Sequence, residues 1–125
     1  SAPRAGGAVP ESSVDVIDLW SMNDRELMDH CDRWYVHDRD PLWVRRNIIV
    51  ILGNIGTADN KNVRRVVGEA LAHPHPVIRA HAVWTAGRLG LVDMVPLHDS
   101  DPMVADEIAH LPALRGPHEA STRHE

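Results

Sequence analysis

Hydrophobic residues recur at three- and four-residue spacing along most of this chain, and clusters of Gly, Pro, Asn and Asp separate the runs. That spacing places the apolar side chains on one face of a helix. The run over residues 41–53 is apolar on so broad a face that we expect its helix to be buried on several sides. The pattern predicts six or seven short helices and no strand. They cover residues 14–20, a helix that starts within 21–24 and reaches 34, then 41–53, 61–72, 76–88, 91–97 and 102–111.

Small polar residues and prolines mark the expected helix ends. Ser21 is a candidate cap for the second helix, and Asp59 or Asn60 for the helix over 61–72, because a side-chain oxygen there accepts from the first backbone N–H groups. Pro41 suits a first helical turn. We expect the run from Gly53 to Gly56 to end the helix over 41–53, because Gly and Asn tolerate the conformation of a helix terminus.

One segment nearly occurs twice. Residues 45–56 are echoed 34 positions later by residues 79–90, with arginine at 45 and 79, glycine at 53 and 87, and glycine again at 56 and 90. A period of about 34 to 40 residues is typical of helical solenoids, in which each helix pair hides its apolar face against the next pair. The sequence therefore predicts an all-α, HEAT-like superhelix of short stacked helices, with residues 45–53 and 79–87 side by side.

The length of 125 residues suggests one domain. We expect a disordered lead-in over 1–12, a helical domain over 13–115 and a flexible tail over 116–125. The single cysteine rules out an internal disulfide framework and favours a reducing compartment. No apolar run is long enough for a membrane span, so we expect a cytoplasmic protein. The chain does not begin with Met, and we interpret it as part of a longer protein.

The formal net charge of −5 conceals a basic centre between acidic flanks. Residues 33–90 carry most of the arginines, and such a centre is one footprint of an anionic partner. The alternative is an ordinary solvated surface of mixed charge. The candidate nucleic-acid contacts are the arginines of this centre: Arg45, Arg46, Arg64, Arg65 and Arg79.

Two interpretations stay open for the matched pair Arg45 and Arg79. Either both hold phosphate oxygens through their planar guanidinium groups, or each pairs with an acidic residue in a neighbouring turn, such as Asp40 or Asp99, and staples the repeats together. A polar residue one turn before the apolar stretch, as at the matched positions Asn47 and His81, is expected to bond a backbone group of the adjacent helix.

No residue pattern indicates catalysis or a metal site. His73 and His75 are close in sequence, but both stand beside prolines in a turn and no further ligand follows at metal-binding spacing. The glycines from Gly53 to Gly56 follow a helix and lack the lysine of a phosphate loop. We therefore predict no catalytic residue, no metal and no cofactor within this chain.

The residues of both repeats resemble one known family. The run from Asp38 to Asn47, followed by Ile51-Leu52-Gly53-Asn54, resembles the start of the C-terminal HEAT-like region of epoxyqueuosine reductases and related iron–sulfur proteins. The stretches 73–84 and 88–90 resemble its next repeat. The resemblance implies a parent enzyme that completes queuosine in tRNA with cobalamin and two 4Fe–4S clusters held by upstream domains. One cysteine cannot hold a cluster, so for this chain it implies only the accessory domain.

The leading hypothesis is therefore an accessory domain that packs on the upstream catalytic domains of the same polypeptide and helps to seat tRNA. The alternative is a protein–protein scaffold without nucleic-acid binding, which the four tryptophans favour because Trp is enriched at binding hot spots. The position of Trp34, Trp43 and Trp84 separates the two, since tryptophans that all lie in the core remove the main support for a scaffold.

Overall fold

The computed structural model describes residues 13–31 and 40–111, and within these ranges its elements are helices joined by turns and loops, with no strand. The prediction of an all-α protein is confirmed. The predicted lead-in over 1–12, the tail over 116–125 and Trp34 lie outside the described residues. The elements are α1 (Ser13–Trp20), α2 (Asp24–Cys31), α3 (Pro41–Ile55), α4 (Lys61–Leu71), α5 (Pro76–Leu89), the 3₁₀ turn η1 (Val92–Met94) and α6 (Pro102–Ala109).

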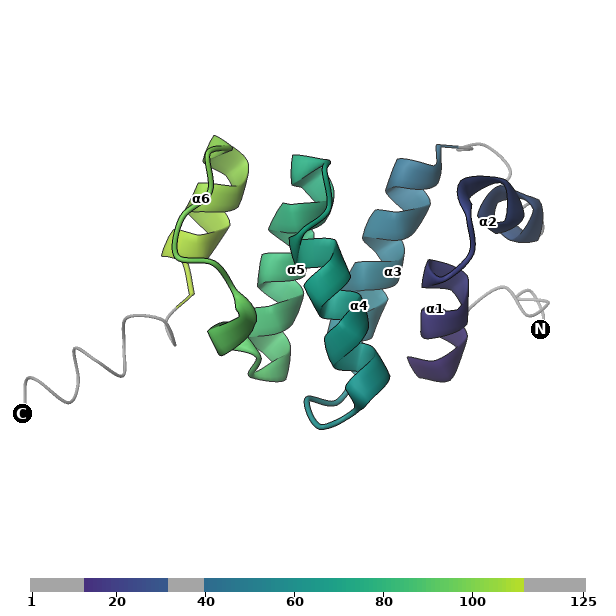
Figure 1. Cartoon of the computed structure of the whole chain (residues 1–125), viewed down its shortest axis with the longest axis horizontal. Helices are drawn as coiled ribbons and strands as arrows, with labels where there is room; N and C mark the ends of the chain where they lie inside the picture. Colours follow the sequence, from purple (N-terminus) through teal and green to yellow (C-terminus); the bar gives the residue numbers. More distant parts are fainter. Residues whose placement is uncertain (1–12, 32–39, 112–125) are drawn as a thin grey trace, which may run out of the picture.

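Helices α3, α5 and α6 stand side by side in that order, and α1 and α4 pack on one side of α3 and α5 (Figure 1). The α3–α5 pair makes the most extensive contact in the fold, followed by α5–α6 and α4–α5. Residues 45–53 and 79–87 therefore lie against each other, as the repeat predicted. The opposite side of α3, α5 and α6 has no helix over it among the described residues.

Polar side chains cap the N-termini of α3, α4 and α6, as the sequence indicates. Asp40, Asn60 and Asp101 each accept from backbone N–H groups in the first turn of α3, α4 and α6. The expectation for Ser21 was wrong. Asn23 and Glu26 bond each other's backbone N–H groups in a capping box at the start of α2, whereas the Ser21 hydroxyl donates to a carbonyl at the end of α1.

Two predicted helix boundaries also differ. Helix α3 does not end at Gly53 but continues to Ile55, and Gly56 ends it with an extended backbone and an N–H bonded to the Leu52 carbonyl. The helix predicted over 91–97 is only the single turn η1, because Pro96 prevents it from continuing. Gly90 does end α5 in the left-handed conformation, with φ of 76°.

Gly53 has a packing role and not a terminating one. A Cβ built at Gly53 lies 2.9 Å from Trp84 Cζ3 and 3.1 Å from Thr85 Oγ1, so the absence of a side chain lets α3 approach α5 closely. Gly87, its repeat equivalent, is approached by the end of the Leu111 side chain, which follows α6. One matched glycine thus lies where α3 meets α5, and the other where α5 meets the residue that follows α6.

The core is one continuous cluster of aliphatic side chains between the two groups of helices. It includes the fully buried Ile49, Leu52, Ile78 and Leu91, and each such side chain contributes about 1.5–3 kcal/mol relative to exposure. Only Thr85 is a buried polar residue among the described residues, and its hydroxyl donates to the Ile49 carbonyl at 2.8 Å. This bond joins α5 directly to the backbone of α3.

Candidate binding surfaces

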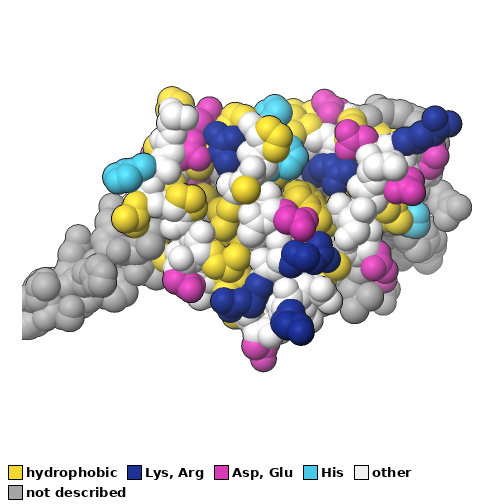
Figure 2. Space-filling model, viewed as in Figure 1, with side chains coloured by type: hydrophobic (Ala, Val, Ile, Leu, Met, Phe, Trp, Pro, Cys, Tyr) yellow, Lys and Arg dark blue, Asp and Glu magenta, His cyan; other side chains and the backbone are white. Residues whose placement is uncertain are grey.

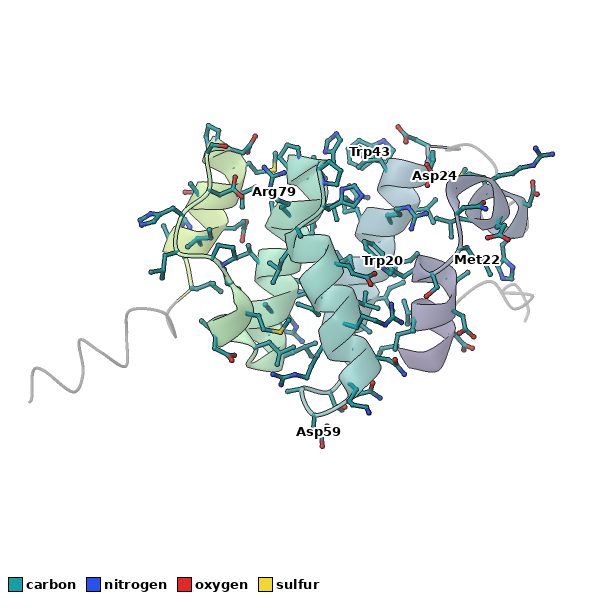
Figure 3. The ribbon with its side chains drawn as sticks, viewed as in Figure 1. Trp20, Met22, Asp24, Trp43, Asp59 and Arg79 are labelled. Atoms are coloured by element: carbon teal, nitrogen blue, oxygen red, sulfur yellow. The ribbon has the colours of Figure 1, made fainter. Side chains whose placement is uncertain are left out.

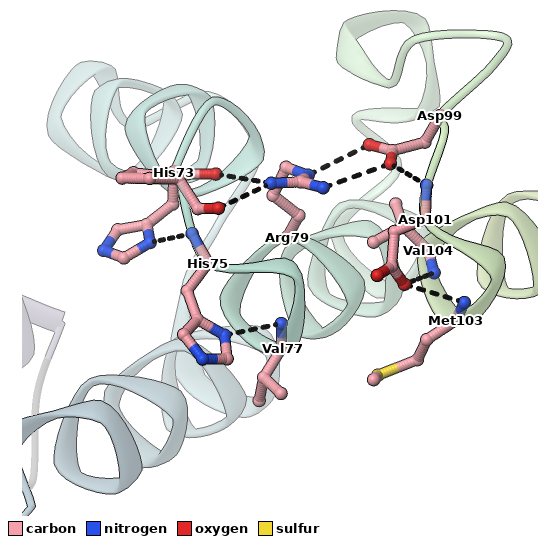
Figure 4. Close-up of polar contacts among 9 residues, drawn as sticks. His73, His75, Val77, Arg79, Asp99, Asp101, Met103 and Val104 are labelled. Carbon is pink, nitrogen blue, oxygen red and sulfur yellow. Dashed lines mark hydrogen bonds and ion pairs between the residues drawn. The ribbon is translucent and has the colours of Figure 1, made fainter.

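Arg79 holds two turns together at the start of α5. Its Nε and Nη2 donate to the two carboxylate oxygens of Asp99 at 3.0 and 3.2 Å, and its Nη1 donates to the carbonyls of His73 and Pro74 (Figure 4). The guanidinium is largely enclosed, with 19% of the side chain exposed. The interpretation of Arg79 as a staple to Asp99 is confirmed. The same bond lowers the pKa of Asp99, and the Asp101 backbone N–H lowers it further.

Arg45 has the equivalent role at the start of α3. It donates to the carbonyls of Trp20 and Met22, at and after the end of α1, and to the Asp24 carboxylate at 2.9 Å. These three partners are labelled in Figure 3. Its acidic partner is thus Asp24 and not the suggested Asp40. Only 13% of its side chain is exposed. Both matched arginines are committed within the molecule, and their role as RNA contacts stays a prediction.

Arg46 points along another face of α3. Consecutive residues of a helix diverge by about 100°, so Arg46 does not share the contacts of Arg45. Its guanidinium lies 4.7 Å from the centre of the Trp43 ring and bonds the Asn47 side-chain oxygen. Trp43 is half-buried. This face of α3 is the one that α1 and α4 leave uncovered.

Helix α5 repeats that arrangement. The Arg88 guanidinium lies 5.3 Å from the centre of the Trp84 ring, and its Nε donates to the Gly53 carbonyl. Trp84 is half-buried, like Trp43, whereas Trp20 is buried and donates to Glu69. Of the three tryptophans that the structure describes, Trp43 and Trp84 are therefore partly exposed, each with an arginine against its ring. Because these tryptophans are not all in the core, the scaffold hypothesis keeps its main support.

Helix α4 presents a separate basic surface. Lys61, Arg64 and Arg65 are exposed on it, and dark blue side chains gather over the lower part of α4 in Figure 2. Arg64 donates to the Ala58 carbonyl, and Arg65 pairs with Glu69 one turn later at 3.3 Å. The five predicted arginines are therefore not one site: two staple turns, two lie on α4, and Arg46 lies on the uncovered face.

A groove runs between α5 and α6 on the uncovered face. One depression of about 300 Å³ is lined by Val50, Ala80, His81, Trp84, Met103 and Glu107. A second of about 250 Å³ continues it past Trp84 and Glu107 toward Gly87, Arg88, Val92, His110 and Leu111. Met103 is 44% exposed at its edge. Sequence reasoning missed this groove, because the residues from α6 belong to no matched position of the repeat.

The histidines have local roles in the described structure. His75 caps α5 by accepting from the Val77 N–H, and the His73 ring accepts from the His75 N–H (Figure 4). The pKa of His73 is lowered, first by burial and then by the Arg45 charge. The His81 ring bonds the Val77 carbonyl of its own helix, so the expected bond to an adjacent helix was wrong. Across residues 13–31 and 40–111 no group of three or more His, Cys, Asp or Glu is placed to hold a metal ion.

The described part of the chain is thus an all-helical structure with a groove between α5 and α6 and a basic surface on α4. No protein-family description, curated protein or solved structure matches the chain. Among the described helices, none combines the length and the apolar character that a bilayer crossing requires.

Proposed function

We propose that this chain is a HEAT-like accessory domain of an epoxyqueuosine reductase-like iron–sulfur protein, where it packs on the catalytic domains and helps to seat tRNA. In this proposal the upstream part of the polypeptide carries the cobalamin and the two 4Fe–4S clusters. The chain itself, with one cysteine, supplies no ligand set for a cluster. It acts as a binding surface and not as an enzyme.

The observation that supports the HEAT-like part is the pair of matched staples. Arg45 and Arg79 lie near the starts of α3 and α5, which pack against each other, and each binds two backbone carbonyls and one carboxylate. The partners of Arg45 lie at the end of α1 and the start of α2, and those of Arg79 lie in the turns before α5 and α6. Gly53 and Gly87 then each leave room for a close neighbour, α5 at Gly53 and the Leu111 side chain at Gly87. Residues that match in sequence thus do matching work in the structure, which is the behaviour of stacked repeats.

The tRNA part is supported by the exposed or partly exposed cations that hold no turns together within the molecule. Lys61 and Arg64 lie at the surface of α4, and Arg46 lies on the uncovered face beside Trp43. Phosphate binding depends on such local positive charge and tolerates an overall negative protein. Arg65 is a weaker contact in this proposal, since Glu69 neutralises it.

The test is to measure the binding of unmodified tRNA to the full chain by fluorescence anisotropy at a series of salt concentrations. Binding is expected at low salt and should weaken steeply as salt rises. Two variants locate the contact: Lys61→Gln with Arg64→Gln removes charge from α4, and Arg46→Gln removes it from the uncovered face. Arg25→Gln removes one exposed charge from α2 and is the matched control.

Each outcome has a defined meaning. A loss of affinity in either test variant, with Arg25→Gln unchanged, supports RNA seating and identifies the face. Absence of binding at low salt refutes the RNA part of the proposal. Binding that none of the variants weakens refutes the assignment of these residues.

A protein scaffold is the second candidate, favoured by the groove between α5 and α6. Trp84 and Met103 line it, and both residue types are enriched at protein interfaces. If the chain binds no RNA but binds the separately expressed upstream domains, and Trp84→Leu abolishes that binding, the scaffold alone is correct.

A further inference from the structure

We infer that the depression between α5 and α6 is a pocket for one unpaired guanine base of an RNA strand. The inference rests on the proposed function and assigns to it a base-reading site that is separate from the phosphate contacts on α4. Its walls are Val50, Ala80, His81, Trp84, Met103 and Glu107, and its volume of about 300 Å³ is in the range of small-ligand sites.

The first argument is the aromatic wall. Trp84 is half-buried and lines both halves of the groove, so part of its indole is accessible from the groove. Proteins that bind single-stranded RNA stack bases on such side chains. Met103 adds a polarisable side chain at the edge, and Val50 adds apolar surface from α3.

The second argument is an unused carboxylate. Glu107 is partly buried, yet within the described part of the chain its side chain makes no hydrogen bond or ion pair. A carboxylate only accepts hydrogen bonds, so Glu107 gives the pocket a free acceptor that suits a ligand with N–H donors. Asp106, its neighbour on α6, is exposed and faces His110.

The third argument is the state of His81. Its Nδ1 lies 2.8 Å from the Val77 carbonyl, which only accepts, so Nδ1 carries the hydrogen. In the neutral ring Nε2 is then an acceptor. The pocket wall therefore offers acceptors from both Glu107 and His81. Guanine is the only common base with two adjacent N–H donors on its Watson–Crick edge, and a carboxylate accepts both.

Local charge decides between guanine and the other planar group rich in N–H donors, an arginine side chain from a partner protein. A partner guanidinium at Trp84 would lie close to Arg88, which already stands 5.3 Å from the ring centre. A neutral base meets no such repulsion, and its phosphates are attracted to Arg88 and Arg46. The Arg88 charge, which shares the second depression with Trp84 and Glu107, therefore favours a nucleotide over a guanidinium.

The experiment compares labelled hexanucleotides that differ at one base, UUUGUU and UUUAUU, by fluorescence anisotropy with the full chain at about 50 mM salt, where phosphate contacts are strong. The wild-type chain is expected to prefer the guanine strand roughly tenfold. Glu107→Gln should abolish that preference, because an amide presents one acceptor and one donor group in place of two acceptors. Asp106→Asn removes the same charge from the exposed side of α6 and should keep it.

Three outcomes overturn the inference. Equal affinity for both strands, or a guanine preference that survives Glu107→Gln, removes the pocket but leaves tRNA seating intact. Binding of acetyl-arginine amide that requires Glu107, with no guanine preference, makes the pocket a protein site. Absence of binding to either strand and to tRNA removes the proposed function as well. Trp84→Leu adds a second readout if circular dichroism shows that the variant is folded.

Discussion

The contact at Gly53 gives a sharp prediction, because the same substitution has opposite effects at two glycines. Alanine is favoured over glycine inside a helix by about 1 kcal/mol, and both Gly53 and Gly68 lie inside helices. At Gly68 a new methyl group meets only the tip of Met94, at 3.4 Å, which is ordinary contact. We therefore expect Gly68→Ala to stabilise the protein by about 0.5–1 kcal/mol.

At Gly53 the methyl group meets atoms that cannot all move away. Trp84 Cζ3 lies 2.9 Å from the built Cβ, Thr85 Oγ1 3.1 Å and the Thr85 Cα 3.4 Å. The hydroxyl is held by its bond to Ile49 and the Cα belongs to the backbone of α5. Overpacking of this kind costs about 1–3 kcal/mol. After the gain in helix propensity, Gly53→Ala is expected to destabilise the fold by up to about 2 kcal/mol.

Urea unfolding followed by circular dichroism measures both variants. The midpoint should fall for Gly53→Ala and rise for Gly68→Ala at an unchanged slope, since the slope reports the surface exposed on unfolding. Gly87→Ala is an intermediate case, because its close neighbour is the end of the Leu111 side chain at 2.6 Å, which rotates more easily than a backbone. A Gly53→Ala variant as stable as Gly68→Ala would show that α3 and α5 are not in close contact here.

Three further predictions concern polar groups. Arg79→Ala should lower the free energy of unfolding by about 2 kcal/mol or more, because it removes charged hydrogen bonds from part-buried groups, whereas Arg65→Ala at an exposed pair should change it little; urea midpoints rank the two. Thr85→Val should cost about 1 kcal/mol through the lost bond to a carbonyl of α3, and a variant as stable as wild type contradicts a net contribution from that bond. The pKa of His73 is lowered in the fold, so the stability it contributes is complete above the unfolded pKa near 6.5 and is lost as pH falls from there through the lowered value; urea midpoints between about pH 7.5 and 5 should fall less in His73→Gln than in wild type, and parallel curves contradict the assignment.

Local sequence signals were sufficient for the five longest predicted runs and for their order, but not for the helix predicted over 91–97. Proline with a preceding polar residue fixed the start of α3 and α6, and the repeated arginine and glycine fixed which helices are neighbours. The end of α3 was misplaced, because a glycine in the sequence does not show whether it terminates a helix or admits a neighbour. Only the packing against Trp84 and Thr85 decides that question at Gly53.

The candidate sites depended more on tertiary structure. The pairing of Arg79 with Asp99 was one of two readings of the sequence, and the geometry selects it. The groove at Glu107 had no signal, because α6 has no counterpart in the matched segment and a lone glutamate on a short helix is usually solvated. The division of the arginines over separate faces likewise follows from helix packing and not from their spacing in the chain.

The position of Arg79 has a consequence for how the domain opens. Its guanidinium is bonded on one side to the turn before α5 and on the other to the turn before α6. Neither helix can detach without releasing the same side chain, so the C-terminal half should exchange its backbone amides with solvent as one cooperative unit. A truncation placed between α5 and α6 would leave that arginine without its carboxylate and Gly87 without Leu111 above it, which makes residue 90 a poor place to divide this chain.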